Sequence, residues 1–414
     1  MPAVQAGLGL LVFPLLAWLI GQDRRRVRPQ RLLLGICVQL LMGMVLLRTP
    51  GVAEMLLWLN DGVLLLESAT AEGSRFMFGY LAGGELPFEE RSPGGAFIVA
   101  FRVLPLVLVV SAVSAVLHHV GVIPLVVRML AAAVQTVFRT GGPLAFGAAS
   151  SVFFGIIEGP VLIRPWLSRM APAELFALMV CGMSTVAGTV MVLYASIIEP
   201  VLPGALGQIL VASLLSVPAA LTISHAMLPA GDGPDTIPVP ERPDPGVVDA
   251  LMRGTAEGTK MVLDIAATII VLFALVHLVN RGLSMLPGDG TWTLQDLVGG
   301  VFRPLLWLTG LSLAETLPAG ELMGTKTVLN EFVAYMDLAD GAAMDLSPRS
   351  RRVVVTTLCG FANLGSLGIL VGGLGSVIPD RKTELAGLAG RAVVAGTLAT
   401  LLTGSVVSLV APSS

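Results

Sequence analysis

The chain of 414 residues is strongly apolar, with 55% hydrophobic and only 13% charged residues and a mean hydropathy of +0.85. Soluble domains carry about 25% charged residues, so this composition is typical of an integral membrane protein. The formal net charge of −3 implies no nucleic-acid partner. The three cysteines, Cys37, Cys181 and Cys359, lie in apolar segments, and their spacing suggests neither a metal site nor a disulfide framework.

The first apolar runs predict two membrane helices. Residues 3–20 form an uncharged run of spanning length, and the basic segment that follows, up to Arg31, is expected on the cytoplasmic side. Residues 32–47 return across the membrane. An amphipathic pattern at 55–66 predicts a short interfacial helix, and residues 72–93 are expected to form a polar external loop.

The middle of the chain contains an interrupted apolar segment. Residues 96–117 form the third long apolar run, and 123–137 are typical of a second interfacial helix. Residues 144–167 follow, with three glycines and two prolines, and this pattern predicts a re-entrant hairpin. Irregular backbone at that depth is tolerated only where protein or water surrounds it. Helices are expected at 174–198 and 206–228.

A Pro- and Asp-rich loop at 229–249 divides the chain into two halves. A spanning helix is expected at 260–286. Residues 297–324 are again interrupted by proline and glycine, which predicts a second hairpin. The remaining apolar helices are expected at 328–338, 353–377 and 389–410.

Two similar strings indicate that the halves are related. CGMSTVAGTVMVL begins at Cys181, and CGFANLGSLGILV begins at Cys359, 359 − 181 = 178 residues later. Each follows an interrupted segment with an acid, which is Glu158 in the first half and Glu315 or Glu331 in the second. Paired broken segments point to a transporter site near the bilayer midplane. The alternative is a chance recurrence of Cys-Gly among small residues.

Glu331 is the principal candidate for a solute contact. It stands beside Asn330 in the apolar stretch TKTVLNEFVAYMDL. A charge at bilayer depth costs at least a few kcal/mol, so it normally faces a partner, a cavity or a substrate. Asn363 and Ser366 lie in the small-residue segment CGFANLGSLGIL and are further candidates. The alternatives are an extramembrane loop for Glu331 and helix–helix hydrogen bonds for Asn363 and Ser366.

Four strings resemble the concentrative nucleoside transporters: GTKTVLNEFVAY, CGFANLGSLGILVGGLGS, FRVLPLVLVVSAVSAVLHHVGVIPLVVR and EGPVLIRPWLSRMAPAELFALMVCGMSTVAGTV. The resemblance extends from roughly Phe76 to the C-terminus. It implies an all-α integral membrane protein of about eight transmembrane helices, two re-entrant hairpins and interfacial helices, with internal inverted repeats. It also implies a homotrimer, embedded in the lipid of the bacterial inner membrane, that imports nucleosides by an elevator motion and is not an enzyme.

The resemblance also divides the chain into parts. Residues 1–122 are expected to be mainly scaffold helices with an interfacial helix, and 123–228 to be the first transport-domain repeat. Residues 229–286 would supply a loop, an interfacial helix and a scaffold helix. Residues 287–388 would be the second transport-domain repeat, and 389–414 the C-terminal helix.

Site residues follow from the matching motifs. The resemblance implies that Glu331, Asn363 and Ser366 hold the ribose hydroxyls, that Phe361 packs against the ligand and that Val190 lines the base pocket. A carboxylate and an amide can pair with two hydroxyls and reject analogues that lack them. No cofactor is expected beyond a coupling ion, either a proton or sodium.

The first hairpin departs from the family pattern, which is Gly-Gln-Thr-Glu or close to it. Here the sequence is Gly155-Ile156-Ile157-Glu158, so the glutamate is kept while isoleucine replaces both polar residues that contact the base. Burying an unpaired polar edge costs a few kcal/mol, so pyrimidine nucleosides are expected to bind weakly. Glu158 can still accept a hydrogen bond from a base. The alternative is a homologue without transport activity that acts as a sensor or an assembly component.

The implied ion site also departs from the pattern. Ser151 stands where sodium-coupled members have asparagine, Phe154 offers a carbonyl, and Thr185 matches a hydroxyl position. Serine reaches less far than an asparagine amide. The sequence therefore favours proton coupling through Glu158 or Glu331, with sodium as the second candidate. Clustered Asp or His motifs, which a membrane-embedded enzyme usually needs, are absent from the sequence.

Overall fold

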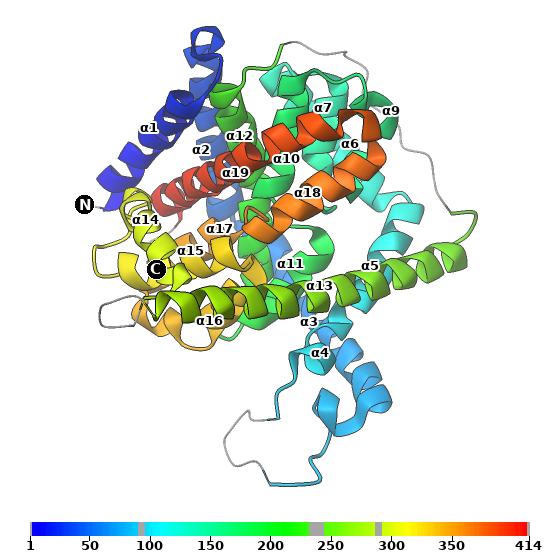
Figure 1. Cartoon of the computed structure of the whole chain (residues 1–414). Coiled ribbons are helices and arrows are strands. Elements are labelled where there is room, and N and C mark those ends of the chain that lie inside the picture. The colour runs from blue at the N-terminus through cyan, green and yellow to red at the C-terminus, as the bar shows by residue number, and fades with distance from the viewer. Residues whose placement is uncertain (1, 90–95, 232–243, 286–291, 412–414) are drawn as a thin grey trace.

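The computed structural model describes residues 2–89, 96–231, 244–285 and 292–411, and most of these residues are helical (Figure 1). Seven segments of this part of the chain are long and apolar enough to cross a membrane. In a bilayer every backbone N–H and C=O needs an internal partner, and helices provide it. The segments are Pro2–Ile20 (α1), Pro29–Arg48 (α2), Val99–His119 (α4 and α5), Pro172–Ile198 (α10 and α11), Ala205–Met227 (α12), Val247–Leu283 (α13) and Pro379–Val410 (η4 and α19).

A further broken segment consists of α17 (Pro348–Leu358) and the apolar helix α18 (Leu364–Val377), each too short to span alone. Together with the seven segments, it confirms the predicted all-α, multi-pass membrane architecture. The central part of the loop expected at 229–249 lies outside the described residues.

Helix α3 is longer than the sequence pattern indicated. It runs from Pro50 to Phe78, so the predictions of a short interfacial helix at 55–66 and of a loop from residue 72 were wrong. The polar residues that were predicted to form a loop, from residue 72 to Phe78, belong to an amphipathic helix instead. An ion pair of 2.8 Å between Arg75 and Glu72 joins neighbouring turns of this helix. The helix ends where Gly79 adopts a φ of +59°.

The first interrupted region has the expected form. Helix α7 (Gly142–Ser150) leads to an irregular tip at 151–157, and the short helices α8 (Glu158–Val161) and α9 (Arg164–Leu167) return from it. This arrangement agrees with the hairpin predicted at 144–167. The following span is itself broken between α10 (Pro172–Ser184) and α11 (Gly188–Ile198).

The second hairpin was placed wrongly at 297–324. Those residues form two continuous helices, α14 (Leu294–Leu308) and most of α15 (Thr316–Val328), which pack side by side. Gly299, Gly320 and Gly324 allow close packing: a Cβ on Gly299 would lie 2.6 Å from the carbonyl oxygen of Gly320. The break that matters comes later, at residues 329–330, before α16 (Glu331–Ala339).

The two halves now show the same order of elements. In each half an interrupted pair leads into a broken span: α7 and α8 precede α10 and α11, while α15 and α16 precede α17 and α18. Glu158 is the first residue of α8, and Glu331 is the first residue of α16. Glu315, the other acid considered for the second half, stands before α15 instead. Glu331 is therefore the counterpart of Glu158.

Helix α13 runs along one side of the molecule and packs mainly along α5 (Pro105–His119) (Figure 1). Only 6% of its most apolar window is buried within the chain. The contact with α5 depends on Gly254 and Gly258, which are buried and four residues apart, so they lie on one face of the helix. Small residues at such spacing let membrane helices approach closely.

We expect Gly254→Ala to destabilise the protein, because its Cβ would lie 2.6 Å from that of Ala115 and 2.7 Å from the carbonyl oxygen of Ser111. Overpacking of this kind costs about 1–3 kcal/mol. Gly282→Ala on the same helix is the matched control, since its Cβ would meet open space. Alanine there is expected to be neutral or to stabilise by up to about 1 kcal/mol. Thermal unfolding in detergent measures both variants, and equal midpoints would contradict the packing argument.

Candidate solute-binding site

Glu331 lies at the meeting of three helices. Its side chain is only 4% exposed, although it carries a carboxylate. Oε1 accepts a hydrogen bond of 2.6 Å from the Tyr194 hydroxyl on α11, and Oε2 accepts one of 2.8 Å from Asn363 Nδ2 at the start of α18. Both carboxylate oxygens are thus held by donors from other elements, which fixes the plane of the group.

Two asparagines begin the helices that converge there. Asn330 Oδ1 accepts from the backbone N–H of Val333 at 3.0 Å and caps α16, and Asn363 Oδ1 accepts from that of Ser366 at 2.7 Å and caps α18. Because its oxygen is used by the cap, the amide nitrogen of Asn363 is left to face Glu331. Helix N-termini carry partial positive charge, so both helices stabilise the carboxylate.

Lys326 adds a full positive charge to the same region. This residue of α15 is completely buried, and its Nζ donates a hydrogen bond of 2.9 Å to the carbonyl oxygen of Thr357. It also attracts the Glu331 carboxylate electrostatically. A buried ammonium and a buried carboxylate each reduce the cost of burying the other.

Sequence reasoning missed both Lys326 and Tyr194. Lys326 carried a usable signal, since it is a second charge in the same apolar stretch as Glu331. Tyr194 carried none, because a tyrosine in an apolar helix has no distinguishing pattern. Only the packing of α11 against α16 reveals its role.

The structure brings several predicted residues to this place. Asn363 contacts Glu331 directly, and Ser366, 4% exposed, bonds Asn363 through its backbone. Val190 is buried on α11 four residues before Tyr194, so the two share a face of that helix. Phe361 is half-buried in the break before α18.

The tip of the first hairpin lies against both broken spans. Ile156 is buried, with its Cα 3.5 Å from where a Cβ of Gly182 on α10 would be, and Ile157 packs against Gly373 on α18. The backbone N–H of Gly188 donates to the carbonyl oxygen of Phe153 at 3.0 Å. This bond joins the tip to the start of α11, about 9 Å along the helix axis from Tyr194.

Glu158 stands apart from the Glu331 cluster. Its side chain is exposed and folds back toward Gly155. None of its described hydrogen bonds involves Tyr194, Glu331 or Asn363. The two corresponding acids therefore occupy different environments in this conformation.

The residues of the implied ion site use their hydroxyls locally. Ser151 Oγ donates to the carbonyl oxygen of Ala148 at 2.8 Å, and Thr185 Oγ1 donates to that of Cys181 at 2.9 Å. The ring of Phe154 contacts His118 edge-on, with centroids 5.7 Å apart. In the described part of the chain, no group of three or more His, Cys, Asp or Glu residues is placed to hold a metal ion.

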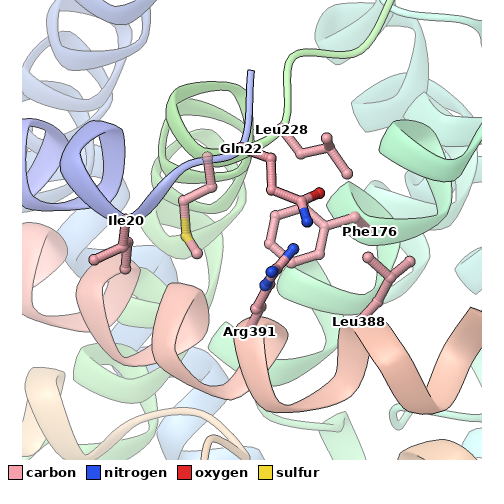
Figure 2. Close-up of a pocket in the computed structure, with 7 residues that line it drawn as sticks. Ile20, Gln22, Phe176, Leu228, Leu388 and Arg391 are labelled. Carbon is pink, nitrogen blue, oxygen red and sulfur yellow. The ribbon is translucent and has the colours of Figure 1, made fainter. Parts of the chain in front are cut away.

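A small hollow lies away from this cluster, between the ends of α1, α10, α12 and α19. Figure 2 shows Gln22 and Arg391 extending into it beside Phe176. No carboxylate lines it. Glu331, Asn363 and Ser366 are by contrast each at most 4% exposed, so the cluster is closed in this conformation. The lining residues of the hollow are Ile20, Gln22, Phe176, Met227, Leu228, Leu388 and Arg391.

Comparison with known proteins identifies the family. Residues 8–81 match the family model described as the N-terminus of the Na+ dependent nucleoside transporter, and residues 208–408 match the model of its C-terminus. The chain belongs to the concentrative nucleoside transporter family. It is a nucleoside transporter family member and not an enzyme, as the sequence predicted.

Among relatives, this transporter is 30% identical over 410 residues to nucleoside permease NupC of Helicobacter pylori, covering 97% of this chain and 96% of the permease. It is 31% identical over 411 residues to the uncharacterized transporter YutK of Bacillus subtilis, covering 97% and 98%.

Solved structures of a family member, CNTnw, are also similar. The inward-facing, substrate-bound state has a TM-score of 0.90 at 31% identity and covers both chains completely. A doubly substituted variant in an outward-facing state has a TM-score of 0.89, covering 99% of this chain and 98% of the other. This nucleoside transporter family member thus shares its fold with CNTnw in both the inward-facing and the outward-facing state.

Proposed function

We propose that the protein is a cation-coupled secondary active transporter that imports nucleosides, or ribose-containing solutes like them, across the bacterial inner membrane. The buried pair of Glu331 and Asn363 carries this proposal. A carboxylate accepts and an amide donates, so together they suit the hydroxyls of a sugar. A buried site of this kind rejects ligands that leave its polar groups unpaired.

The base is proposed to extend from Glu331 toward the first hairpin. Val190 and Tyr194 share one face of α11, and the hairpin tip is bonded to the beginning of the same helix. The rise of about 9 Å along α11 between Gly188 and Tyr194 is of the order of the length of a nucleoside. Ile156 and Ile157 belong to that tip, so they would present an apolar surface to the base.

Assembly and movement are proposed to follow the family pattern. The repeats 123–228 and 287–388 would move as an elevator against the remaining helices, within a homotrimer surrounded by lipid. The long apolar helix α13 supports this, because a face of that size needs lipid or a second copy of the chain to cover it. The CNTnw structures in inward- and outward-facing states support a moving transport part.

We expect Glu331→Gln to reduce nucleoside uptake into proteoliposomes at least tenfold, roughly the value of one hydrogen bond to a charged group. Glutamine keeps the shape, but its amide must turn its oxygen toward the fixed Nδ2 of Asn363 and loses acceptor capacity for the ligand. Glu174→Gln is the matched control, since Glu174 is also buried and accepts from the backbone N–H of Ala171 at 2.9 Å. Wild-type uptake by the Glu331 variant would show that this residue does not bind substrate.

For coupling, we expect an imposed proton gradient to drive uptake more strongly than a sodium gradient. The reason is Ser151, a short side chain whose hydroxyl already donates to Ala148. Ser151→Asn is expected to increase sodium dependence, and adding Thr185→Val is expected to remove that gain. Sodium-driven accumulation by the wild type at fixed pH, absent in potassium, would contradict proton coupling.

For specificity, we expect uridine and cytidine to bind weakly, because each missing partner for a buried polar edge costs about 1–3 kcal/mol. Ligands that keep a ribose-like diol but carry a less polar or differently shaped aglycone are expected to bind better. A purine nucleoside remains a candidate, because Glu158 can accept a hydrogen bond from an N–H of the base. The double change Ile156→Gln with Ile157→Thr should raise the affinity for uridine, measured by calorimetry. Micromolar uridine binding by the wild type, unchanged in the double variant, would show that these isoleucines do not determine the substrate.

A further inference from the structure

Resting on the function proposed above, we infer that Tyr194 is a positioning residue, whose hydroxyl orients the Glu331 carboxylate for a vicinal sugar diol. The hydroxyl donates to Oε1 at 2.6 Å, and the tyrosine is only 2% exposed. The bond crosses between the two halves of the chain, since Tyr194 lies on α11 and Glu331 on α16.

The Tyr194 ring packs against α16, the same helix that carries Glu331. Its ring lies 5.0 Å from the ring of Tyr335 and 6.3 Å from that of Phe332, measured between centroids, and both partners belong to α16. Aromatic packing of this kind limits the movement of the ring. The hydroxyl is therefore a fixed donor rather than a mobile one.

Counting acceptors shows what the fixed carboxylate offers. A carboxylate has about four lone-pair positions, two on each oxygen. Tyr194 uses one position on Oε1, and Asn363 uses one on Oε2. These two side chains leave a second position on each oxygen, and the separation of the two positions is set by the carboxylate itself.

Two neighbouring acceptors in a fixed plane match two hydroxyl donors on adjacent carbons. A ribonucleoside provides such a pair, whereas a 2′-deoxynucleoside would leave one buried acceptor unpaired. If the Tyr194 bond is removed, only Asn363 holds the carboxylate, which can then rotate and no longer presents both acceptors to the diol in a fixed plane. Tyr194 thus contributes to discrimination between the two sugars without contacting the ligand.

The test compares Tyr194→Phe with Tyr335→Phe in the full-length protein. Each variant removes one buried hydroxyl from the same aromatic group, but that of Tyr335 donates to the carbonyl oxygen of Val355 at 3.0 Å instead of to Glu331. Binding of adenosine and of 2′-deoxyadenosine is measured by calorimetry. The readout is the affinity for adenosine divided by the affinity for 2′-deoxyadenosine. A loss of stability alone weakens the binding of both ligands alike and leaves this ratio unchanged.

We expect Tyr194→Phe to lower the ratio at least about threefold, a change typical of neighbours in one hydrogen-bonded network. Tyr335→Phe is expected to leave the ratio unchanged. Tyr194→4-aminophenylalanine keeps the ring and an N–H donor, so it should restore the wild-type ratio. The same variant is measured in place of Tyr194→Phe if the phenylalanine variant does not fold. An unchanged ratio, an increased ratio, or the same decrease in both phenylalanine variants overturns the inference.

The proposed function has a separate signature. The proposed function is wrong if the wild type binds neither adenosine nor another nucleoside in a panel and Glu331→Gln leaves uptake unchanged. The inference about Tyr194 is then wrong as well. If the wild type binds nucleosides and Glu331→Gln prevents it, the function stands whatever the Tyr194 ratio shows.

Discussion

The structure depends on one constraint, the cost of keeping the Glu331 carboxylate out of water. Burying an isolated charge costs several kcal/mol, so partners must surround it. The chain provides hydrogen bonds from Tyr194 and Asn363, the N-terminal ends of α16 and α18, and the nearby ammonium of Lys326. The helix breaks are what place these ends in the interior, because an uninterrupted span would have both of its ends at the membrane surface.

The two halves share this architecture but have diverged chemically. In the second half, Asn330 caps α16 with its side chain directly before Glu331. In the first half the corresponding cap position of α8 is occupied by Ile157, which makes no side-chain cap bond. One interrupted region is therefore a hydrogen-bonding site and the other a mainly apolar contact, although their backbones have the same order of elements.

Sequence patterns predicted what depends on local chemistry. Long apolar runs predicted most of the spans, and the glycines and prolines at 144–167 predicted the first hairpin. Polar side chains inside apolar segments indicated Glu331 and Asn363 as candidates. The second hairpin was misplaced because a glycine that breaks a helix and one that lets helices pack closely look the same in a sequence. In α14 and α15, Gly299, Gly320 and Gly324 allow close packing, and the proline of α14, Pro304, is accommodated within the helix.

The partners of Glu331 could not be predicted in the same way. Tyr194 lies 137 residues earlier in the chain, and its bond depends on how α11 packs against α16. The extent of α3 was missed for a related reason. Its polar residues lie on a continuous helix, and a linear interpretation of polarity assigned them to a loop.

The buried Lys326 has an electrical consequence. Moving one elementary charge across a membrane potential involves about 2.3 kcal/mol per 100 mV. Lys326 and Glu331 lie five residues apart in the same part of the chain, so in an elevator motion they would travel together and their opposite charges would cancel. This pair would then contribute little to any voltage dependence in the return of the empty site.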